Sequence, residues 1–338
     1  MREPHTVALV TGGAGFIGSH LCDRLTADGA RVLCLDNLIT GRSDNLRSLE
    51  RERRFDFFEH DVIEPLPPWL SRARITRIYH FACAASPDHY QADPEHTMLT
   101  NVAGTRHVLR LAEQTGARLL LASTSEIYGD PEIHPQTEDY AGSVNCTGPR
   151  ACYDEGKRAA EALTFDFHRH QRADVRVARI FNTYGPRMRC DDGRVISNMA
   201  CQALSGGDIT IYGDGSQTRS FCFIDDMIEG LTRLMECRAA QGLPVNLGNP
   251  EELSILALAK RMIELTGSRS RIIQRPLPTD DPRRRKPDIG RALKLLGWRP
   301  TVGLEQGLEA TIEWFDDERN RIAQPAYVDA PPVATAAE

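Results

Sequence analysis

The sequence predicts an α/β fold, in which a doubly wound parallel sheet is followed by a smaller C-terminal lobe. Short apolar runs alternate with amphipathic helical patterns as far as residue 181, and a glycine-rich turn follows the first run. Unbroken apolar runs are typical of strands covered by helices on both faces. After about residue 185 this rhythm ends, and glycine and proline become frequent. A chain of 338 residues buries a large core without a metal, so no metal site is expected.

The elements of the first half follow from these patterns in chain order. Apolar runs predict strands over residues 7–10, 31–36, 55–58, 75–82, 117–123 and 175–181. The first helical pattern begins at Phe16, and its apolar residues recur at three-to-four spacing until Gly29 ends it. Two further helices are predicted over about residues 95–115 and 153–170.

Composition and charge exclude several classes of protein. With 41% hydrophobic and 26% charged residues, the chain is neither disordered nor a coiled coil. Its net charge of −6 gives no basic field, so we expect no nucleic-acid partner. It has no long apolar run and no recognisable leader, so we expect no membrane partner. The nine cysteines form no C-x-x-C pair, which predicts free thiols in a reducing compartment.

The glycine-rich turn after the first strand predicts a dinucleotide site. Gly12, Gly15 and Gly18 would let helix N–H groups approach a pyrophosphate. A tight turn without a ligand would show the same glycines, but Asp36 ends the second strand, where a carboxylate binds an adenosine ribose. This carboxylate would repel a 2′-phosphate, which favours NAD over NADP. Asp61 ends the third strand, where we expect the adenine edge.

A tyrosine and a lysine share one helical face in the segment Y-D-E-G-K, residues 153–157. A surface tyrosine packed on a lysine stem would show the same spacing. Chemistry favours a catalytic pair, because the ammonium of Lys157 would stabilise a phenolate at Tyr153. Such a phenolate can take a proton from a sugar hydroxyl while the carbon of that hydroxyl gives a hydride to NAD+. The hydroxyl cluster Ser123, Thr124 and Ser125 follows a strand, so it should line the same cleft.

Together, the glycine turn, the hydroxyl cluster and the Y-x-x-x-K pair resemble the extended short-chain dehydrogenase/reductase superfamily, which implies a Rossmann-type domain. Longer segments resemble the UDP-glucuronate decarboxylase (UDP-xylose synthase) family, and the similarity runs from about residue 6 to residue 315. These segments are residues 123–131 (S-T-S-E-I-Y-G-D-P), 148–158 (G-P-R-A-C-Y-D-E-G-K-R), 178–188 (A-R-I-F-N-T-Y-G-P-R-M), 245–250 (V-N-L-G-N-P) and 285–288 (R-K-P-D). We expect an NAD-binding domain over residues 1–185, a lobe over residues 186–320 that mainly binds the UDP-sugar, and a disordered tail over residues 324–338.

The resemblance implies a carboxy-lyase with tightly bound NAD. In that family, C4 of UDP-glucuronate is oxidised by NAD+, CO2 leaves from C6, and reduction of the ketone gives UDP-xylose. Tyr153 would be the base at the C4 hydroxyl and later the acid, Lys157 would lower its pKa, and Thr124 would hydrogen-bond the same hydroxyl. Glu126 would position the sugar and handle the C5 proton or a water. Arg285 would meet the substrate carboxylate or stabilise the enolate.

Two sets of binding residues are expected. The NAD set contains Gly12, Gly15, Phe16, Ile17, Gly18, Asp36, Asn37, Thr40, Asp61, Val62, Phe81, Cys83, Thr100, Tyr153 and Lys157. The UDP-sugar set contains Ser125, Asn182, Arg194, Tyr212, Arg219 and Arg285. Arg194 could equally be an arginine at the edge of the core with no role in binding the UDP-sugar. We expect Arg283 and Arg284 on a solvated face.

The sequence departs from the family pattern at two places. The family commonly has a lysine where Leu99 stands, and if that lysine binds the carboxylate, this chain lacks one charge-assisted contact. In the segment A-C-A-A-S-P, residues 82–87, Cys83 and Ala84 replace a serine and a proline. Neither change removes a member of the catalytic set, but both leave the substrate preference open.

Four alternatives remain on the same fold. A 4,6-dehydratase needs an acid directly before the glutamate, where this chain has Ser125. A 4-epimerase shares the first oxidation and releases no CO2. An oxidative decarboxylase that gives a UDP-4-keto-pentose occurs in a bacterial relative with a formyltransferase domain, which we do not expect in 338 residues. A redox-sensing NAD module would have lost the Tyr–Lys pair.

The resemblance also carries expectations about assembly and location. Relatives usually dimerise through two helices of each subunit, so a homodimer is expected. Animal relatives carry a Golgi membrane anchor, whereas this sequence starts a few residues before its first strand, so a cytoplasmic location is expected.

Overall fold

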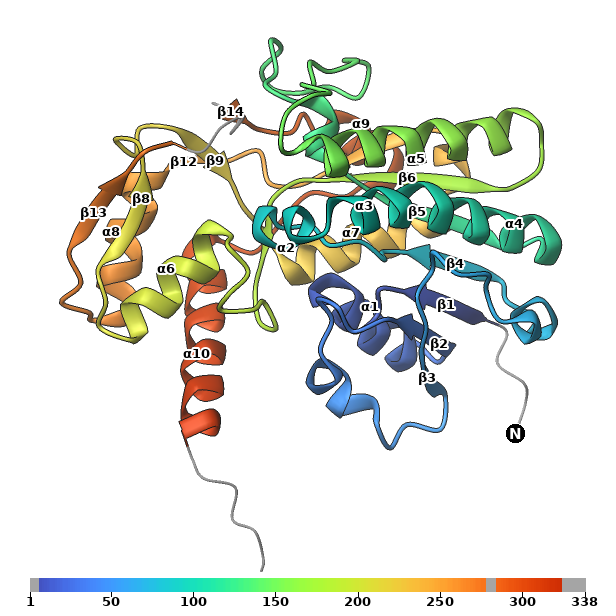
Figure 1. Cartoon of the computed structure of the whole chain (residues 1–338), viewed down its shortest axis with the longest axis horizontal. Coiled ribbons are helices and arrows are strands. Elements are labelled where there is room, and N and C mark those ends of the chain that lie inside the picture. The colour runs from blue at the N-terminus through green and yellow to red at the C-terminus, as the bar shows by residue number, and fades with distance from the viewer. Residues whose placement is uncertain (1–5, 278–283, 324–338) are drawn as a thin grey trace, which may run out of the picture.

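Seven parallel strands form the central sheet of this computed structural model, which describes residues 6–277 and 284–323 (Figure 1). Their order across the sheet is β11-β6-β5-β4-β1-β2-β3. Six of them lie where apolar runs predicted strands, so the predicted α/β, Rossmann-type fold class is confirmed. The strands are β1 (Val7–Thr11), β2 (Arg31–Asp36), β3 (Phe55–Glu59), β4 (Arg77–His80), β5 (Arg118–Thr124), β6 (Val175–Ile180) and β11 (Pro244–Leu247).

Helices cover both faces of the sheet, because alternate residues of a strand point to opposite sides. In β1, Ala8 and Val10 pack in one apolar cluster with α1 and α7, whereas Leu9 packs in a second cluster with α4 and α5. Within the described ranges, none of the helices combines the length and apolarity that a membrane span needs. The four covering helices are α1 (Phe16–Ala27), α4 (Thr105–Thr115), α5 (Ala151–Arg169) and α7 (Ile224–Glu236).

Strand order reverses beside β1, which pairs with β2 on one side and β4 on the other. The chain continues from β2 to β3 in one direction and from β4 to β5 and β6 in the other. Connections leaving the carboxyl ends of β1 and β4 therefore diverge and open a crevice, which is where open α/β sheets bind ligands. The glycine turn and the hydroxyl cluster both lie at this edge.

The helix predicted over residues 95–115 is built in three pieces. α3 (Pro94–Leu99) follows the short α2 (Pro87–Ala92) and continues into a π-helical turn (Thr100–Gly104) and then into α4. A Cβ at Gly104 would lie 2.7 Å from Cγ2 of Val62, so the turn passes close to the end of the third strand. Wider turns of this kind occur often at functional sites.

Most residues after 185 form a second lobe beside the sheet (Figure 1). However, α7 and β11 return to the main sheet, and α9 packs against β11, so the chain crosses between the lobes repeatedly. The division at residue 185 and the role of the lobe stay predictions. The expected disordered tail, 324–338, and Arg283 lie outside the described residues. The later elements are β7 (Thr183–Tyr184), α6 (Val195–Leu204), β8 (Ile209–Tyr212), β9 (Thr218–Ser220), β10 (Cys222–Phe223), β12 (Glu252–Ser254), α8 (Ile255–Thr266), β13 (Ile272–Arg275), β14 (Arg284–Arg285), α9 (Gly290–Leu296) and α10 (Leu304–Ala323).

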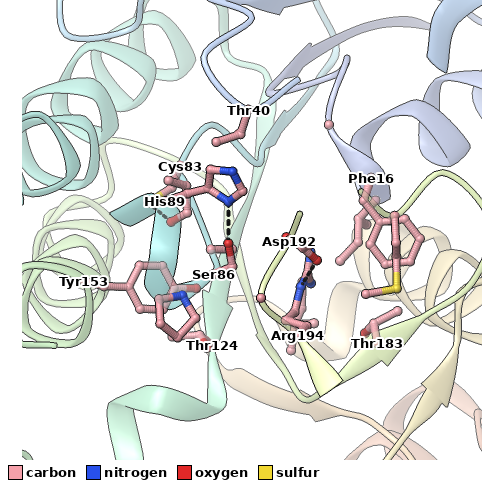
Figure 2. A pocket seen from close by; sticks show the side chains of 18 of the residues that line it. Phe16, Thr40, Cys83, Ser86, His89, Thr124, Tyr153, Thr183, Asp192 and Arg194 are labelled. Atoms are coloured by element: carbon pink, nitrogen blue, oxygen red, sulfur yellow. Dashed lines mark hydrogen bonds and ion pairs between the residues drawn. The ribbon is translucent and has the colours of Figure 1, made fainter. Parts of the chain in front are cut away.

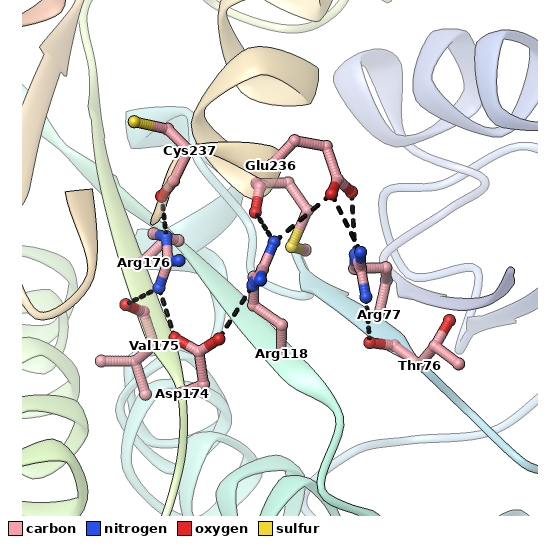
Figure 3. Close-up of polar contacts among 9 residues, drawn as sticks. Thr76, Arg77, Arg118, Asp174, Val175, Arg176, Glu236 and Cys237 are labelled. Atoms are coloured by element: carbon pink, nitrogen blue, oxygen red, sulfur yellow. Dashed lines mark hydrogen bonds and ion pairs between the residues drawn. The ribbon is translucent and has the colours of Figure 1, made fainter. Parts of the chain in front are cut away.

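An ion-pair network joins the end of α7 to the amino ends of three strands (Figure 3). Glu236 accepts hydrogen bonds from Arg77 at 2.8 and 2.9 Å and lies 3.3 Å from Arg118. Arg118 also donates to Asp174 at 2.9 Å, and Asp174 pairs with the buried Arg176. The network lies opposite the carboxyl edge, so it supports the sheet without touching the crevice.

Two of the nine cysteines form a disulfide, which makes the expectation of free thiols wrong for this pair. Cys190, in the loop after β7, is bonded to Cys201 in α6, with Cα atoms 5.9 Å apart. The two cysteines are 11 residues apart and belong to no recognisable cysteine motif, so it is the packing of the loop on α6 that brings them together. The other seven cysteines are free thiols. The compartment in which the protein works stays a prediction.

Candidate active site

A cavity of about 540 Å³ lies at the carboxyl edge of the sheet and extends to the second lobe. Asp61 is the one predicted site residue that does not line it. The predicted residues that do are Gly12, Gly15, Phe16, Ile17, Gly18, Asp36, Asn37, Thr40, Val62, Phe81, Cys83, Thr100, Thr124, Ser125, Glu126, Tyr153, Lys157, Asn182, Arg194, Tyr212, Arg219 and Arg285.

The glycine turn depends on close backbone contacts at two positions. Gly12 has φ +74°, and a Cβ there would lie 2.7 Å from the backbone nitrogen of Ala82. A Cβ at Gly18 would lie 2.1 Å from the carbonyl oxygen of Gly12, so only glycine lets α1 pack directly on the turn. The N-terminal N–H groups of α1 consequently face the cavity, where their positive partial charge favours an anion such as a phosphate.

Two carboxylates sit at the ends of β2 and β3, and only the first lines the cavity. Asp36 is buried and accepts hydrogen bonds from the N–H groups of Ala14 at 2.9 Å and Leu38 at 2.8 Å. Burial raises the pKa of Asp36, although these N–H groups oppose the shift. The carboxylate of Asp61 accepts a hydrogen bond from Asn37 at 2.8 Å and lies 2.7 Å from Nε2 of His96. Asp61 therefore orients Asn37, which lines the cavity, and does not line the cavity itself.

Tyr153, Lys157 and Thr124 meet where β5 ends against α5 (Figure 2 shows the tyrosine and the threonine). Lys157 Nζ donates to the carbonyl oxygen of Ala122 at 2.9 Å and lies 5.8 Å from the centre of the Tyr153 ring. Burial raises the pKa of Tyr153 well above its usual value, and the hydrogen bond with Thr124 opposes this shift. Burial also lowers the pKa of Lys157. A phenolate here therefore needs the positive charge that lies beside it.

A buried charge cluster occupies the sugar end of the cavity. Glu126 lies 2.7 Å from Nη1 of Arg285 and 2.9 Å from Nη2 of Arg150. Burial alone would raise the pKa of Glu126, but the two guanidinium groups outweigh it and lower that pKa, so the carboxylate stays ionised. Arg285 Nη1 also lies 3.3 Å from Oδ1 of Asn182. Its Nη2 is buried and has no hydrogen-bond partner among the described residues.

The second lobe supplies further polar groups on the opposite wall. Arg219 and Arg285 are register partners in the parallel pair of β9 and β14, which places the two residues side by side in a small three-stranded sheet. Arg194 pairs with Asp192 and lies 5.7 Å from the ring of Phe16, so it borders the glycine turn (Figure 2). Tyr212, at the end of β8, remains 45% exposed at the mouth of the cavity.

Sequence reasoning missed Arg150 at the sugar end of the cavity. Arg150 lies within a segment that resembles the family, yet its contact with Glu126 depends on a loop between β5 and α5 whose path no local pattern reveals. Leu99 is 42% exposed and does not line the cavity, whereas the next residue, Thr100, does. The effect of a leucine at position 99 on substrate preference stays a hypothesis. Arg284 is exposed, as expected for a residue on a solvated face, whereas Arg285 is buried.

Comparisons with known proteins agree with this geometry. Residues 8–248 match the model of the NAD dependent epimerase/dehydratase family. The chain is 51% identical to UDP-glucuronic acid decarboxylase 1 of Danio rerio, over 96% of this chain and 76% of that protein. It is 53% identical to UDP-glucuronic acid decarboxylase 4 of Arabidopsis thaliana, over 91% and 68%.

A solved structure shows the same fold with ligands bound. The UDP-glucuronic acid 4-epimerase of Bacillus cereus, in complex with UDP-glucuronic acid and NAD, superimposes with a TM-score of 0.84 at 29% identity, over 93% of this chain and all of that one. The chain therefore belongs to the NAD dependent epimerase/dehydratase family and, within it, groups with the UDP-glucuronic acid decarboxylases.

Proposed function

We infer that this protein is a UDP-glucuronate decarboxylase that converts UDP-glucuronate to UDP-xylose. The observation that carries the assignment is Arg285, whose Nη2 is buried without a hydrogen-bond partner in a cavity that also holds Tyr153 and Lys157. A buried guanidinium nitrogen is costly unless an acceptor meets it, and a sugar carboxylate offers a matching charge. The sequence similarity to the UDP-glucuronic acid decarboxylases of Danio rerio and Arabidopsis thaliana supports the same reaction.

The residues at the glycine turn fit NAD. The turn leaves no room for a side chain at Gly12, and the α1 N-terminus behind it suits a pyrophosphate. Asp36 lines the cavity where a ribose diol would lie, and His60, which also lines it, has a buried Nε2 without a hydrogen-bond partner among the described residues. We propose that Asp36 holds the adenosine ribose and Lys157 the nicotinamide ribose. Bound NAD supplies reversible hydride transfer at C4 of the sugar.

Tyr153 is proposed to move the proton at the C4 hydroxyl. Its phenolate takes that proton while C4 becomes a ketone, and its phenol returns the proton when the ketone is reduced. Thr124, which hydrogen-bonds Tyr153, orients the same hydroxyl. Lys157, anchored on Ala122, is proposed to hold a positive charge beside the ring, where it stabilises the phenolate.

Decarboxylation follows from the position of the ketone. A ketone at C4 makes the C6 carboxylate a β-keto acid, so the electron pair left by CO2 spreads into an enolate. Arg285 orients the carboxylate and then stabilises the developing negative charge. Glu126 stays ionised between Arg150 and Arg285, so it accepts hydrogen bonds from the sugar or from a water that protonates C5, and does not itself donate that proton.

The nucleotide end of the substrate is proposed to lie against the second lobe. Arg219 and Arg194, which line the cavity, are proposed to meet the diphosphate, together with Asn182, which lies next to Arg285. Tyr212 lies at the mouth of the cavity, where the uridine ring would pass, and Ser125 lies on the sugar side.

The test is incubation of the purified protein with UDP-glucuronate and analysis of the product by mass. We expect a loss of about 44 Da, the mass of CO2, with no net NADH. Deuterium at C4 of the substrate should reappear in UDP-xylose. An unchanged mass with inverted C4 would indicate a 4-epimerase, and a released 4-keto-pentose with accumulated NADH would indicate an oxidative decarboxylase.

We also propose that the protein is a homodimer. Leu99 and Val102 are apolar, 42% and 37% exposed, and lie on successive turns of the helical path that leads into α4. A second copy packed on this surface would remove both side chains from water. Light scattering after size-exclusion chromatography should give twice the chain mass of 37.7 kDa, and the substitution Val102→Glu should lower it.

A further inference from the structure

The catalytic tyrosine is stacked on a second tyrosine. The rings of Tyr90 and Tyr153 have centroids 4.9 Å apart and planes that differ by 4°. Tyr90 is 1% exposed and Tyr153 5% exposed, so the contact is a buried one. Sequence patterns assign no role to Tyr90, which belongs to α2, whereas Tyr153 belongs to α5.

Backbone contacts fix Tyr90 in place. Its N–H donates to the carbonyl oxygen of Ser86 at 2.9 Å, which closes the first turn of α2. Its carbonyl oxygen accepts hydrogen bonds from Thr97 at 3.1 Å and from the thiol of Cys152 at 3.6 Å. Cys152 directly precedes Tyr153, so the same contact ties α2 to the turn of α5 that carries the catalytic ring.

The hydroxyl of Tyr90 is not used in these contacts. Its oxygen is buried and has no hydrogen-bond partner among the described residues. Tyr90 is not among the residues that line the cavity, and the charges that act on its hydroxyl are those of Arg150, Glu126, Asp154 and Arg285. Burial raises the pKa of Tyr90, which keeps the hydroxyl protonated and uncharged. The contact between Tyr90 and the catalytic tyrosine is therefore the ring stack.

We propose that Tyr90 is a positioning residue for the decarboxylase reaction, and that its ring sets the plane of the Tyr153 phenol. The inference rests on the proposed function, since it assumes that Tyr153 transfers the C4 proton. The second torsion of a tyrosine side chain is soft, so the ring of Tyr153 needs a neighbour to hold its plane. A parallel ring at 4.9 Å does this and also excludes water from one face.

The correct plane matters because it directs the hydrogen bonds of the phenol oxygen. Thr124 hydrogen-bonds the phenol, and the ammonium of Lys157 lies 5.8 Å from the ring centre. The phenol oxygen lies on the axis about which the ring turns, so a rotated ring keeps the oxygen in place but directs its in-plane lone pairs away from Thr124 and the sugar hydroxyl. Loss of this alignment slows proton transfer at the C4 hydroxyl. The stacked ring itself does not stabilise the phenolate, because its electron-rich face repels negative charge. Its contribution is orientation.

The test compares Tyr90→Leu with Tyr90→Phe, and uses Tyr79→Leu as a matched control. Tyr79 is a 2% exposed tyrosine of β4 that lies outside the cavity, so its truncation reports the general cost of losing a buried ring. We expect Tyr90→Leu to lower kcat about 10- to 100-fold with KM for UDP-glucuronate almost unchanged. Tyr90→Phe should keep kcat within about threefold of wild type, because phenylalanine retains the ring.

Two further readouts separate positioning from a loss of folding. In Tyr90→Leu, the acid limb of the pH profile of kcat should move to higher pH, because the phenolate loses the aligned hydrogen bond with Thr124 that lowers its pKa. With C4-deuterated substrate, the isotope effect on kcat should persist or grow, since hydride transfer becomes slower. Rates are normalised to the fraction of chains that bind NAD, and Tyr90→Met replaces Tyr90→Leu under the same criteria if the leucine variant does not fold.

Either of two results would overturn the proposal. A kcat for Tyr90→Leu as high as that of wild type or of Tyr79→Leu would show that the ring positions nothing. A loss in Tyr90→Phe as large as that in Tyr90→Leu would show that the hydroxyl acts instead. Failure of the proposed function would look different, because wild type itself would then release no CO2 from UDP-glucuronate.

Discussion

Arg285 and Glu126 are joined by an ion pair of 2.7 Å at the sugar end of the cavity. Arg285 comes from β14 in the second lobe, and Glu126 follows β5 in the main sheet, so the pair links the two parts of the molecule. Glu126 occupies Nη1 of Arg285 and leaves Nη2 for a ligand. The pair thus holds a cation in a fixed orientation with one donor nitrogen still to be satisfied.

Substitution of Arg285 should remove decarboxylation, whereas substitution of its neighbour should not. Arg285→Ala deletes the group that meets the carboxylate and leaves Glu126 paired with Arg150, so we expect a fall in kcat of about 100-fold or more. Arg284→Ala, at an exposed position, is the matched control and should behave as wild type. CO2 release from UDP-glucuronate measures both. Equal activity of the two variants would disprove the role of Arg285.

Tyr153→Phe should abolish turnover and leave the fold intact. The change removes only the phenol oxygen, so the ring still stacks on Tyr90. The melting temperature and NAD binding serve as controls, and both should stay close to wild type. Residual decarboxylation at more than about one thousandth of the wild-type rate would mean that another group moves the C4 proton.

We expect the buried carboxyl group of Asp154 to make the stability of the fold decrease as pH rises. Burial and the nearby charge of Glu126 raise its pKa from 3.8 to about 7, although Arg150 and Arg285 oppose the shift. Between these two pH values the folded chain binds more protons than the unfolded chain, so the contribution to the free energy of unfolding decreases as pH rises. Asp154→Asn cannot ionise. Its melting temperature relative to wild type should therefore rise between about pH 4 and pH 8, and a constant difference would contradict the prediction.

The network in Figure 3 should stabilise the fold without affecting catalysis. Arg118 donates to Asp174 and lies next to Glu236 with its side chain only 16% exposed. Arg118→Met should lower the free energy of unfolding by about 2 kcal/mol. Arg271→Met, which removes a pair whose arginine is 81% exposed, should cost about 0.5 kcal/mol or less. Urea unfolding measures both, and kcat should not change in either variant.

The disulfide should affect substrate binding. Cys190 belongs to the loop between β7 and α6, and residues 187–189 and 192–194 of this loop line the cavity. Cys190→Ser releases the loop from α6, so we expect KM for UDP-glucuronate to rise a few-fold with kcat almost unchanged. A reductant should have the same effect on wild type and none on the variant. If the reductant acts equally on both, the disulfide is not the cause.

Local patterns predicted the parts of this fold that depend on local interactions. Strands buried on both faces are apolar throughout, so the six strands up to β6 were visible as runs, and the glycine turn was visible because close backbone approach excludes side chains. β11 was not predicted, because residues 244–247 follow an irregular region and join the sheet only by pairing with β6.

In the candidate site, too, the residues with a local sequence signal were predicted, and those that depend on contacts between distant segments were not. Tyr153 and Lys157 were found because one helix holds them at a fixed spacing, and Arg285 was found through its resemblance to a family segment. Arg150 and Tyr90 were missed, since their roles arise from contacts between separate elements. A spacing along the chain carries no information about a stack between α2 and α5.

The return of β11 to the main sheet determines how this protein can be dissected. A fragment that stops at residue 185 would contain β6 but not its outer neighbour, so a row of unpaired N–H and C=O groups would become an open sheet edge. It would also lose α7, which covers α1, and expose the apolar side chains beneath it. We therefore expect that residues 1–185 do not fold as an independent unit, and that the enzyme is best engineered as a whole.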